Sequence, residues 1–536
     1  MKREARTFSS GASLEFDVCL IGAGPAGLTL AQSLASAGHS VCLLEAGGET
    51  PPRKVLWDSG GRVVGEPYCR LRAPGRSGPG GNSWFWQYKD QYNTPAMGGG
   101  FRSRPLDPID FEQRDWVPNS GWPISYHDLA PWYPAAHALS GLVFDDYEAG
   151  HWADSQHEPL ALGHGVESTI YQLGPPYRFQ ELAVEVAALP GVTLIHHANV
   201  TALEESETPG VLTSARIAIP SGGGFRVRAR QFVLAGGGIE NARLLLASSF
   251  ARPGQHANPK DQVGRYYLEH PHVETGELRA IDYNSPTLAF YRRHRTRDTQ
   301  VLGMFRISED VQRREGLLNA VCELQPRGPE FSSPAVRSFS ELRYGLRHWS
   351  RPNGVLAHSR NVLLGPRAVA RAATLKVRGR LESHPSLPRL LFTMEQVPNP
   401  GSRVTLGPQR DEFGVPKPVL DWRLTPLDSR SIHHTQEILD RAFREAGLGP
   451  ISERWDEATP HPRRNGCWHN VGTTRMSATS ENGVVDPNGR VHGMRNLFIA
   501  GSSVLPTAGP ASITLTLVAL SLRLANHLNH ELSPSG

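Results

Sequence analysis

The sequence predicts a mixed α/β protein, α+β when the whole chain is considered, that begins with a βαβ unit. Two observations carry this prediction. Between residues 16 and 45, a strand, a glycine-rich turn, a helix and a second strand follow one another. Near the C-terminus, the run 496–503 indicates a buried strand followed by a glycine turn. The chain of 536 residues is long enough for about two to four domains.

The N-terminal run has the spacing of a dinucleotide-binding site. A short apolar strand, Phe16-Asp-Val-Cys-Leu-Ile, leads directly into Gly22-x-Gly24-x-x-Gly27, and a helix is expected from Leu28 to Ala37. In this motif the first glycine allows a tight turn, the second lets the backbone approach a pyrophosphate, and the third lets helix and strand pack closely. The free N–H groups at the start of the helix then face the phosphates.

The strand that follows adds the second part of the motif. Ser40-Val-Cys-Leu-Leu ends in Glu45, which lies 18 residues beyond Gly27. An acid in this position hydrogen-bonds the adenosine ribose in such units. The run therefore predicts a Rossmann-like dinucleotide site contacted by Gly22, Gly24, Gly27 and Glu45.

The sequence favours FAD over a nicotinamide cofactor. Flavoproteins that use NAD(P)H usually need a second glycine fingerprint, and the sequence contains none. The stretch Val233-Leu-Ala-Gly236-Gly-Gly-Ile-Glu240 has a different glycine spacing and indicates a strand, a turn and a helix with Glu240 in its first turn. With FAD as the only dinucleotide, the electrons leave to oxygen or to an external acceptor.

Composition excludes several classes of function. The chain is 39% hydrophobic and 20% charged, so it can build a large core and is not disordered. The net charge of +4 is small and the basic residues are scattered, so no nucleic-acid partner is indicated. No apolar run is long enough to span a bilayer, and the first residues are polar. We expect a cytoplasmic protein without a membrane partner; its oligomeric state stays open.

The cysteines give no sign of a metal site. The chain has five of them: Cys19, Cys42, Cys69, Cys322 and Cys467. They are widely spaced and form no metal-binding pattern. Cys19 and Cys42 lie within apolar strands, so buried free thiols in a reducing compartment are expected.

One stretch of the chain is distinctly basic. Residues 353–390 hold seven Lys and Arg residues against Glu382 alone. A solvated helix face is the preferred interpretation. An anionic partner or a contact between subunits is the alternative.

Several longer motifs lie along the rest of the chain. They are Gly80-Gly-Asn-Ser83-Trp-Phe-Trp, Arg104-Pro-Leu-Asp-Pro-Ile-Asp-Phe, Gly121-Trp-Pro-Ile, Ala235-Gly-Gly-Gly-Ile-Glu240-Asn-Ala-Arg, Glu269-His-Pro-His272, Glu395-Gln-Val-Pro-Asn-Pro, His469-Asn-Val-Gly472-Thr-Thr-Arg475 and Val485-Asp-Pro-Asn-Gly-Arg490. With these residues the chain resembles the glucose–methanol–choline (GMC) oxidoreductases, and among them the branch similar to pyranose 2-oxidase. The resemblance covers nearly the whole chain.

The resemblance implies an FAD-dependent oxidoreductase with two interleaved domains. A Rossmann-like FAD-binding domain would be assembled from discontinuous segments, and a substrate domain would hold a large antiparallel sheet with flanking helices. Residues 1–269 would belong mainly to the FAD domain, with an inserted cap or substrate-domain portion around 60–150. Residues 270–460 would form the substrate domain, and 461–536 would return to the FAD domain.

The resemblance also implies further cofactor contacts. In such proteins the strand at 496–499 carries the chain back to the flavin pyrophosphate, and the following helix is expected from Ile513 to Leu528. The residues implied in this way are Gly81, Asn82, Ser83, Val200, Gly236, Gly501, Ser502 and Thr514. Val200 would make backbone contacts on the adenine side.

Alcohol oxidation by a flavin needs a base for the hydroxyl proton, and His469 is the candidate. Imidazole is the side chain whose unperturbed pKa lies near neutrality, and His469 lies in a predicted turn. By resemblance it occupies the position of the catalytic histidine. His270, His272 and His492 are expected to be structural. Asn470 is a minor alternative, because adjacent side chains usually point apart.

Two positions depart from the pattern of the relatives. Pyranose oxidase relatives carry a second catalytic Asn or His where this chain has Ser512. A hydroxyl can hold the substrate oxygen but cannot act as a base, so a direct role for Ser512 stays open. Some relatives attach FAD covalently through a histidine where this chain has Phe85. A phenyl ring cannot form that bond, so non-covalent FAD is expected.

The predicted reaction is removal of a hydroxyl proton by His469 with hydride transfer to FAD. By resemblance, the preferred substrate is the primary alcohol of an amino sugar or pseudosaccharide, such as an aminoglycoside precursor in antibiotic biosynthesis, oxidised to an aldehyde. A pyranose or glycoside oxidised at a ring hydroxyl is the first alternative. A flavin monooxygenase would need a nicotinamide site, and a non-catalytic flavoprotein is favoured only by the change at Ser512.

Overall fold

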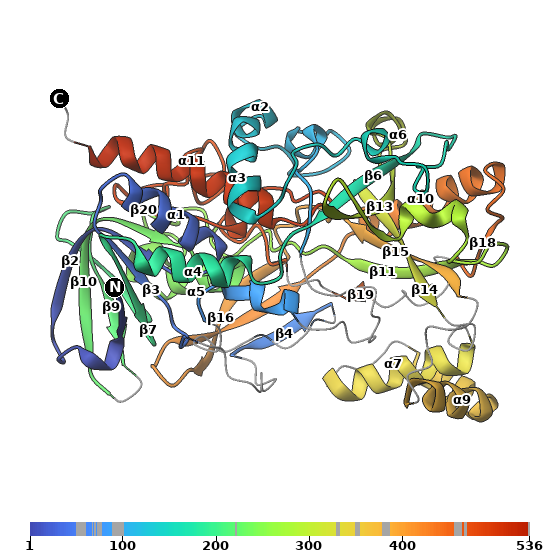
Figure 1. Cartoon of the computed structure of the whole chain (residues 1–536). Coiled ribbons are helices and arrows are strands. Elements are labelled where there is room, and N and C mark those ends of the chain that lie inside the picture. Colours follow the sequence, from blue (N-terminus) through green and yellow to red (C-terminus); the bar gives the residue numbers. More distant parts are fainter. Residues whose placement is uncertain are drawn as a thin grey trace.

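Two large sheets lie at opposite ends of an elongated molecule, and a small three-stranded sheet lies between them (Figure 1). The computed structural model describes residues 1–49, 60–66, 68, 71, 78–87, 101–219, 222–327, 333–348, 354–377, 386–454, 464–465 and 469–533. For residues 85–87, 344–345, 347–348, 375–377 and 464–465 it describes the backbone alone. The sheet order and the segments that build each sheet follow from the pairing of the strands.

The first sheet is largely parallel and has eight strands in the order β1-β7-β3-β2-β10-β9-β8, with β20 paired to β10. The strands are β1 (Lys2–Glu4), β2 (Ser13–Ile21), β3 (Val41–Leu44), β7 (Val192–His196), β8 (Asn199–Glu205), β9 (Leu212–Ala218), β10 (Gly224–Leu234) and β20 (Leu497–Ile499). All pairs from β1 to β10, and β10 with β20, run parallel, whereas β9 and β8 are antiparallel. The Rossmann-like sheet is therefore built from segments at both ends of the chain, as predicted.

Helices cover this sheet because its strands are apolar on both faces. All four residues of β3 are buried, which is typical of a parallel strand enclosed by helices. Against the sheet and one another pack α1 (Pro25–Ser36), α3 (Tyr133–Ser140), α4 (Arg178–Ala188) and α11 (Thr514–Leu532). Helix α1 begins at Pro25, three residues before the expected start, because proline is well suited to the first position of a helix.

The second sheet is antiparallel throughout and has nine strands in the order β18-β11-β15-β14-β13-β6-β5, with β12 paired to β13 and β19 to β11. Its strands are β5 (Arg102–Ser103), β6 (Val166–Leu173), β11 (His272–Leu278), β12 (Arg293–Thr296), β13 (Thr299–Ile307), β14 (Ala320–Arg327), β15 (Leu387–Met394), β18 (Ile451–Ser452) and β19 (Arg464–Asn465). The large antiparallel sheet expected after residue 270 is thus present, and β5 and β6 join it from upstream. The exact domain boundaries stay a prediction.

The third sheet connects the two ends of the molecule. It consists of β16 (Arg403–Arg410), β17 (Pro416–Trp422) and β4 (Arg62–Gly65), and α5 (Gly237–Ala247) packs against it. The remaining helices are α2 (Tyr126–Leu129), α6 (Glu309–Glu315), α7 (Pro334–His348), α8 (Val355–Leu364), α9 (Pro366–Val377) and α10 (Pro426–Glu445). Figure 1 shows α7 and α9 projecting below the second sheet.

Each large sheet has its own hydrophobic core. In the second, Tyr291 stacks on Phe305 with ring centroids 4.0 Å apart, and Phe443 of α10 packs edge-on against Phe305. Cys19 and Cys42 are buried free thiols in the first core, as predicted, and Cys322 is buried in the second. Cys69 and Cys467 lie outside the described residues. In the described part of the chain, no helix is long and apolar enough to cross a membrane.

Candidate active site

The glycine-rich turn after β2 has the shape that a cofactor pyrophosphate requires. A Cβ atom at Gly22 would lie 2.5 Å from the Ala235 carbonyl oxygen, and one at Gly27 would lie 1.9 Å from the Gly22 carbonyl oxygen. Protein packing therefore demands glycine at both positions. A Cβ atom at Gly24 would meet only the Gly81 Cα, at 4.0 Å. The open space beside Gly24 fits a group that approaches the backbone closely.

The segment that carries Gly81, Asn82 and Ser83 lies directly on this turn. The Gly80 N–H donates to the Ala23 carbonyl at 2.8 Å. Ser83 is buried, donates to the Gly80 carbonyl at 2.7 Å and accepts from Gln180 at 2.8 Å, so its hydroxyl already holds the segment in place. Asn82 is exposed. The structure thus brings these three predicted residues to the glycine turn, although they lie far along the chain.

Glu45 lies buried at the end of β3. Its carboxylate accepts hydrogen bonds from the backbone N–H groups of Ala23, at 3.1 Å, and Gly47, at 2.8 Å. Burial nevertheless raises the pKa of Glu45. The Ala198 N–H donates to the Glu45 carbonyl at 2.9 Å, so β8, which carries Val200, begins beside it. Glu45 and Val200, the two residues expected on the adenosine side, therefore lie close together.

We refer to the predicted cofactor site, formed by the glycine turn, Glu45, residues 81–83 and the segments below, as the cradle. Its C-terminal part comes from β20 and the turn after it. Gly501, with φ of +100°, lies over the start of α1, where its Cβ would be 3.7 Å from Ala26. The Gly236 N–H donates to the Asn241 side chain at 2.7 Å, and the Asn241 amide donates to the Ser503 hydroxyl at 2.9 Å. Thr514 is buried at the start of α11. Three distant segments of the chain therefore meet at the predicted cofactor site.

The loop that carries His469 is held against this turn. The Thr474 N–H donates to the Ser503 carbonyl at 2.9 Å, and the Met476 N–H donates to the Val504 carbonyl at 2.7 Å. The Ser502 hydroxyl donates to the Asn470 carbonyl at 2.6 Å. On its other side, Val471 exchanges two backbone hydrogen bonds of 3.0 Å with Leu268. His469 therefore lies between the cofactor turn and the segment that enters the second sheet.

His270 is the direct neighbour of His469. Their Nδ1 atoms are 2.8 Å apart, and the rings meet edge-on with centroids 4.9 Å apart. Burial, and then the charge of His270, lower the pKa of His469 well below its ordinary value. Burial and then His272 lower the pKa of His270 to about 3, although hydrogen bonds to the backbone of Ala508 and Gly509 oppose this. Both imidazoles are therefore neutral at pH 7.

Glu269 ties the two histidine segments together. Its carboxylate accepts from the backbone N–H groups of His270, at 3.1 Å, and His469, at 3.3 Å, and from the Tyr68 hydroxyl. The Asn470 side chain turns instead to Tyr267, whose hydroxyl donates to it at 2.8 Å. Asn470 thus points away from the ring of its neighbour.

Ser512 has a less defined environment. It lies half-buried two residues before α11, and its hydroxyl makes no hydrogen bond within the described residues. The structure therefore does not connect it to His469. The Phe85 side chain lies outside the described atoms. His270, which we expected to be only structural, makes the contact with His469 that the sequence did not indicate.

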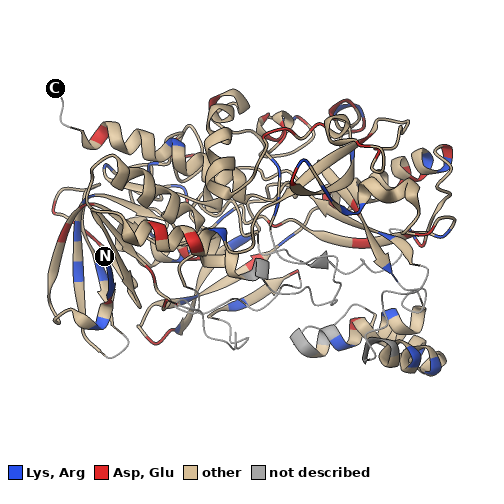
Figure 2. Ribbon diagram, in the orientation of Figure 1, with Lys and Arg blue, Asp and Glu red and all other residues tan. Residues whose placement is uncertain are grey.

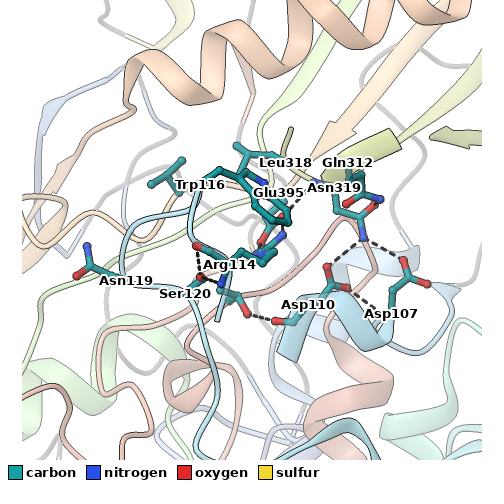
Figure 3. A network of polar contacts seen from close by, with 12 residues as sticks. Asp107, Asp110, Arg114, Trp116, Asn119, Ser120, Gln312, Leu318, Asn319 and Glu395 are labelled. Atoms are coloured by element: carbon teal, nitrogen blue, oxygen red, sulfur yellow. Dashed lines mark hydrogen bonds and ion pairs between the residues drawn. The ribbon is translucent and has the colours of Figure 1, made fainter. Parts of the chain in front are cut away.

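A buried polar network supports the loop before Ser512 (Figure 3). Asn319 donates to Asp107 and to Asp110, both at 3.0 Å, and Arg114 pairs with Glu395. Burial, and then the charge of Asp107, raise the pKa of Asp110 to about 8. Among the described residues, no group of three His, Cys, Asp or Glu side chains could hold a metal ion.

A Rossmann-like sheet with this cradle, and a neutral histidine beside it, define a flavin-dependent oxidoreductase. Residues 398–521 match the family model described as GMC oxidoreductase, and residues 15–53 match an FAD binding domain. Paromamine 6'-oxidase of Streptomyces fradiae is 25% identical over 96% of this chain and 92% of its own length. C-glycoside 3-oxidase of Arthrobacter globiformis is 38% identical over 23% of each chain.

Solved structures agree on the fold. Formate oxidase of Aspergillus oryzae, studied as an R554A variant, matches with a TM-score of 0.52 and 16% identity over 98% of this chain and 99% of its own. The resemblance to the GMC oxidoreductases is confirmed. The protein is an FAD-dependent oxidoreductase that acts on CH–OH donors.

Proposed function

We propose that this chain oxidises the primary alcohol of an amino sugar or pseudosaccharide to an aldehyde, with His469 as the base. The likeness to paromamine 6'-oxidase, which spans almost the whole length of both chains, supports this substrate class. The observation that carries the role of His469 is the contact of its Nδ1 with His270. Within the described residues, this contact leaves its Nε2 without a hydrogen-bond partner and available to a substrate hydroxyl.

The contact of two Nδ1 atoms determines where the protons are. Only one of two neutral imidazoles can donate in such a contact, and the other must accept. If His469 donates through Nδ1, its Nε2 carries a lone pair and can accept a proton. We assign this arrangement, with the proton of His270 on Nε2, because it is the one that leaves the Nε2 lone pair of His469 free to accept a proton.

His469 then acts as a general base and His270 as its positioning residue. The lowered pKa keeps His469 neutral, so the base is ready at neutral pH. Glu269 holds the backbone N–H groups of both histidines and thereby fixes their separation. General-base catalysis is typically worth on the order of 10²–10⁴-fold in rate.

The cradle supplies the place for the cofactor. Gly24, Gly81, Glu45, Gly236 and Gly501 would hold FAD, without a covalent bond. Bound in this cradle, FAD would supply the acceptor for the hydride of the carbon whose hydroxyl proton is removed. Half-buried Ser512 is available to hold the substrate oxygen, and oxygen or an external acceptor then takes the electrons.

A second candidate substrate is a neutral glycoside oxidised at a ring hydroxyl. Among the described residues, two acidic side chains of this region are already paired: Glu269 with Tyr68, and Glu323 with Arg102. An ammonium group would have to displace one of these partners, whereas a neutral sugar would not. The likeness of one quarter of the chain to C-glycoside 3-oxidase also supports this candidate.

Anaerobic reduction of the flavin tests both candidates. The compounds tested are paromamine, neamine, glucose and a plain glycoside. The measurement is the loss of the absorbance of oxidised flavin after each compound is added. We expect the aminoglycoside precursors alone to bleach the flavin, and bleaching by glucose or the glycoside would establish the second candidate. His469→Ala should keep its FAD and lose the reductive step by about 10²–10⁴-fold. Unchanged reduction in that variant would refute His469 as the base.

A further inference from the structure

Helices α7, α8 and α9 form a small lobe that packs mainly on itself. The three helices contact one another, and Arg337 of α7 is paired with Glu453, after β18. In Figure 1 the lobe projects from the lower side of the second sheet, away from the first sheet. We refer to residues 334–348 and 354–377 as the helical lobe. None of its residues takes part in the cofactor cradle or the histidine pair.

The lobe displays most of the exposed apolar side chains of the protein. In the described part of the chain, ten large apolar side chains are exposed, and six of them lie on the lobe. They are Phe339, Leu346, Val355, Leu356, Leu363 and Leu364. Every exposed leucine among the described residues belongs to this set. Such a concentration of apolar surface on one small feature marks an interaction site.

Helix α8 turns polar side chains towards α7 and its leucines away from it. Its polar residues His358 and Asn361 face α7, where both hydrogen-bond the buried Ser338 hydroxyl, at 3.2 and 3.1 Å. Gly365, at the end of α8, also faces α7, because a Cβ there would lie 2.5 Å from Ala335. The inner face of α8 therefore includes polar and small groups beside Val362.

The leucines of α8 lie on the opposite face. Leu356, Leu363 and Leu364 are 87, 78 and 74% exposed. With Arg360 they occupy positions i, i+4, i+7 and i+8, which share one side of a helix of 3.6 residues per turn. No residue of α8 is buried. The hydrogen bonds to Ser338 fix the leucines outward, and no other described residue of the chain covers this face.

The charge around the leucines is positive. From 334 to 377 the sequence has eight Lys and Arg residues and one acid, Glu341. Arg343, Arg360 and Arg367 are exposed, and Figure 2 shows basic residues on the helices of the lobe. Leucines interleaved with arginines on a projecting helix are typical of segments that lie in the interface of an anionic bilayer.

We propose that the helical lobe docks the protein on anionic phospholipid membranes, with the leucines of α8 inserted and Arg360 and Arg367 on lipid headgroups. A second copy of the chain would bring the same arginines together, and their repulsion opposes such a dimer. The leucine face is convex and made by one helix, which suits a deformable lipid surface better than the shaped groove of a protein. The expectation of no membrane partner rested on the lack of a spanning segment, which peripheral binding does not need.

Co-sedimentation with vesicles tests the proposal on the intact holoenzyme. We expect the protein to bind vesicles of phosphatidylcholine with phosphatidylglycerol at least about tenfold more strongly than vesicles of phosphatidylcholine alone, with binding weakened by salt. Leu356→Ser, Leu363→Ser and Leu364→Ser combined should reduce binding at least about tenfold, because apolar insertion is lost. Arg360→Gln with Arg367→Gln should remove the preference for phosphatidylglycerol.

The control is Val184→Ser, which removes an exposed apolar side chain, 59% exposed, from α4, in the first half of the molecule. It should bind vesicles as the unmodified protein does. All variants should keep their bound flavin and activity, which shows that they fold. The proposal is overturned if the unmodified protein ignores anionic vesicles, or if the triple leucine variant binds them equally well. A dimer that the triple variant converts to a monomer, without vesicle binding, would instead assign the lobe to contacts between copies.

Discussion

The carboxylate of Asp110 lies against Gly509, so close that a methyl group at position 509 would come within 2.2 Å of Asp110 Oδ2. Gly509 belongs to the loop that runs from Thr507, whose hydroxyl donates to the Asp110 carbonyl, to Ser512. The same loop offers its backbone to His270. The buried network of Figure 3 therefore contacts this loop through Asp110.

Gly509→Ala should destabilise the protein and slow the flavin reduction. Position 509 has φ of +51° and no room for a side chain, so left-handed strain and overpacking together should cost about 2–4 kcal/mol. Thermal unfolding measures the loss. Gly414→Ala is the control, because Gly414 has φ of +81° and nothing within 4 Å of a Cβ; it should cost only about 1–2 kcal/mol. Equal losses in the two variants would contradict the contact with Asp110.

Asp110→Asn should change how stability depends on pH. The pKa of Asp110 is raised from 3.8 to about 8 in the folded protein, so the folded state holds a proton that the unfolded state releases. Its contribution to stability is complete below pH 3.8 and is lost as the pH rises towards 8. The variant lacks this group, so its melting temperature should fall less between pH 5 and pH 8 than that of the unmodified protein. Parallel curves for both proteins would show that Asp110 is ionised throughout.

His270→Asn should shift the acid limb of kcat/KM to higher pH. With His469 as the proposed base, its lowered pKa keeps the imidazole neutral, and so able to accept a proton, below pH 6.5. Since His270 contributes to that lowering, its removal raises the pKa of His469, and the pH profile of kcat/KM reports this value. His272→Asn is the comparison and should move the limb less, because the charge that lowers the pKa of His469 is that of His270. A profile unchanged by His270→Asn would contradict the coupling.

Gly24→Ala and Gly27→Ala should fail in different ways. A methyl group at Gly24 meets only the Gly81 Cα at 4.0 Å, whereas one at Gly27 would lie 1.9 Å from a carbonyl oxygen. The Gly24 variant should therefore fold and carry much less flavin per protein. The Gly27 variant should lose both stability and flavin. A Gly24 variant with full flavin content would show that the cofactor does not approach this position.

Acid denaturation should release the flavin intact. Phe85 stands where some relatives carry the attaching histidine, and a phenyl ring forms no such bond. After precipitation with acid, the yellow colour should be in the supernatant, with FAD as the released species. Colour that stays with the precipitated protein would establish a covalent link elsewhere.

The glycine turn after β2 and the position of Glu45 could be predicted because their sequence signals are local. Gly22, Gly24, Gly27 and Glu45 lie within one strand–helix–strand unit, and their spacing alone indicates which backbone must turn and where a ligand can approach. A large antiparallel sheet was predicted after residue 270 and is present. The sequence did not indicate that β5 and β6, which precede residue 270, join it. Pairing between distant strands depends on the tertiary structure, which periodicity along the chain does not report.

The histidine pair and the helical lobe needed the structure. His270 and His469 are 199 residues apart, and they meet because Leu268 pairs with Val471; no local pattern contains that pairing. The basic stretch after residue 353 could be found in the sequence, where it indicated a solvated helix face. Only the hydrogen bonds of His358 and Asn361 to Ser338 show which side of α8 faces inward.

The attachment of the His469 loop to the turn at 502–504 has a consequence for protein engineering. The loop that carries His469, the proposed base, is hydrogen-bonded to the cofactor half of the chain, whereas β12 to β15 belong to the other half. Strands of the second sheet could therefore be exchanged with those of a relative to change which alcohol is accepted, without rebuilding the base. The boundary for such chimaeras lies after His270, which has to stay with its partner.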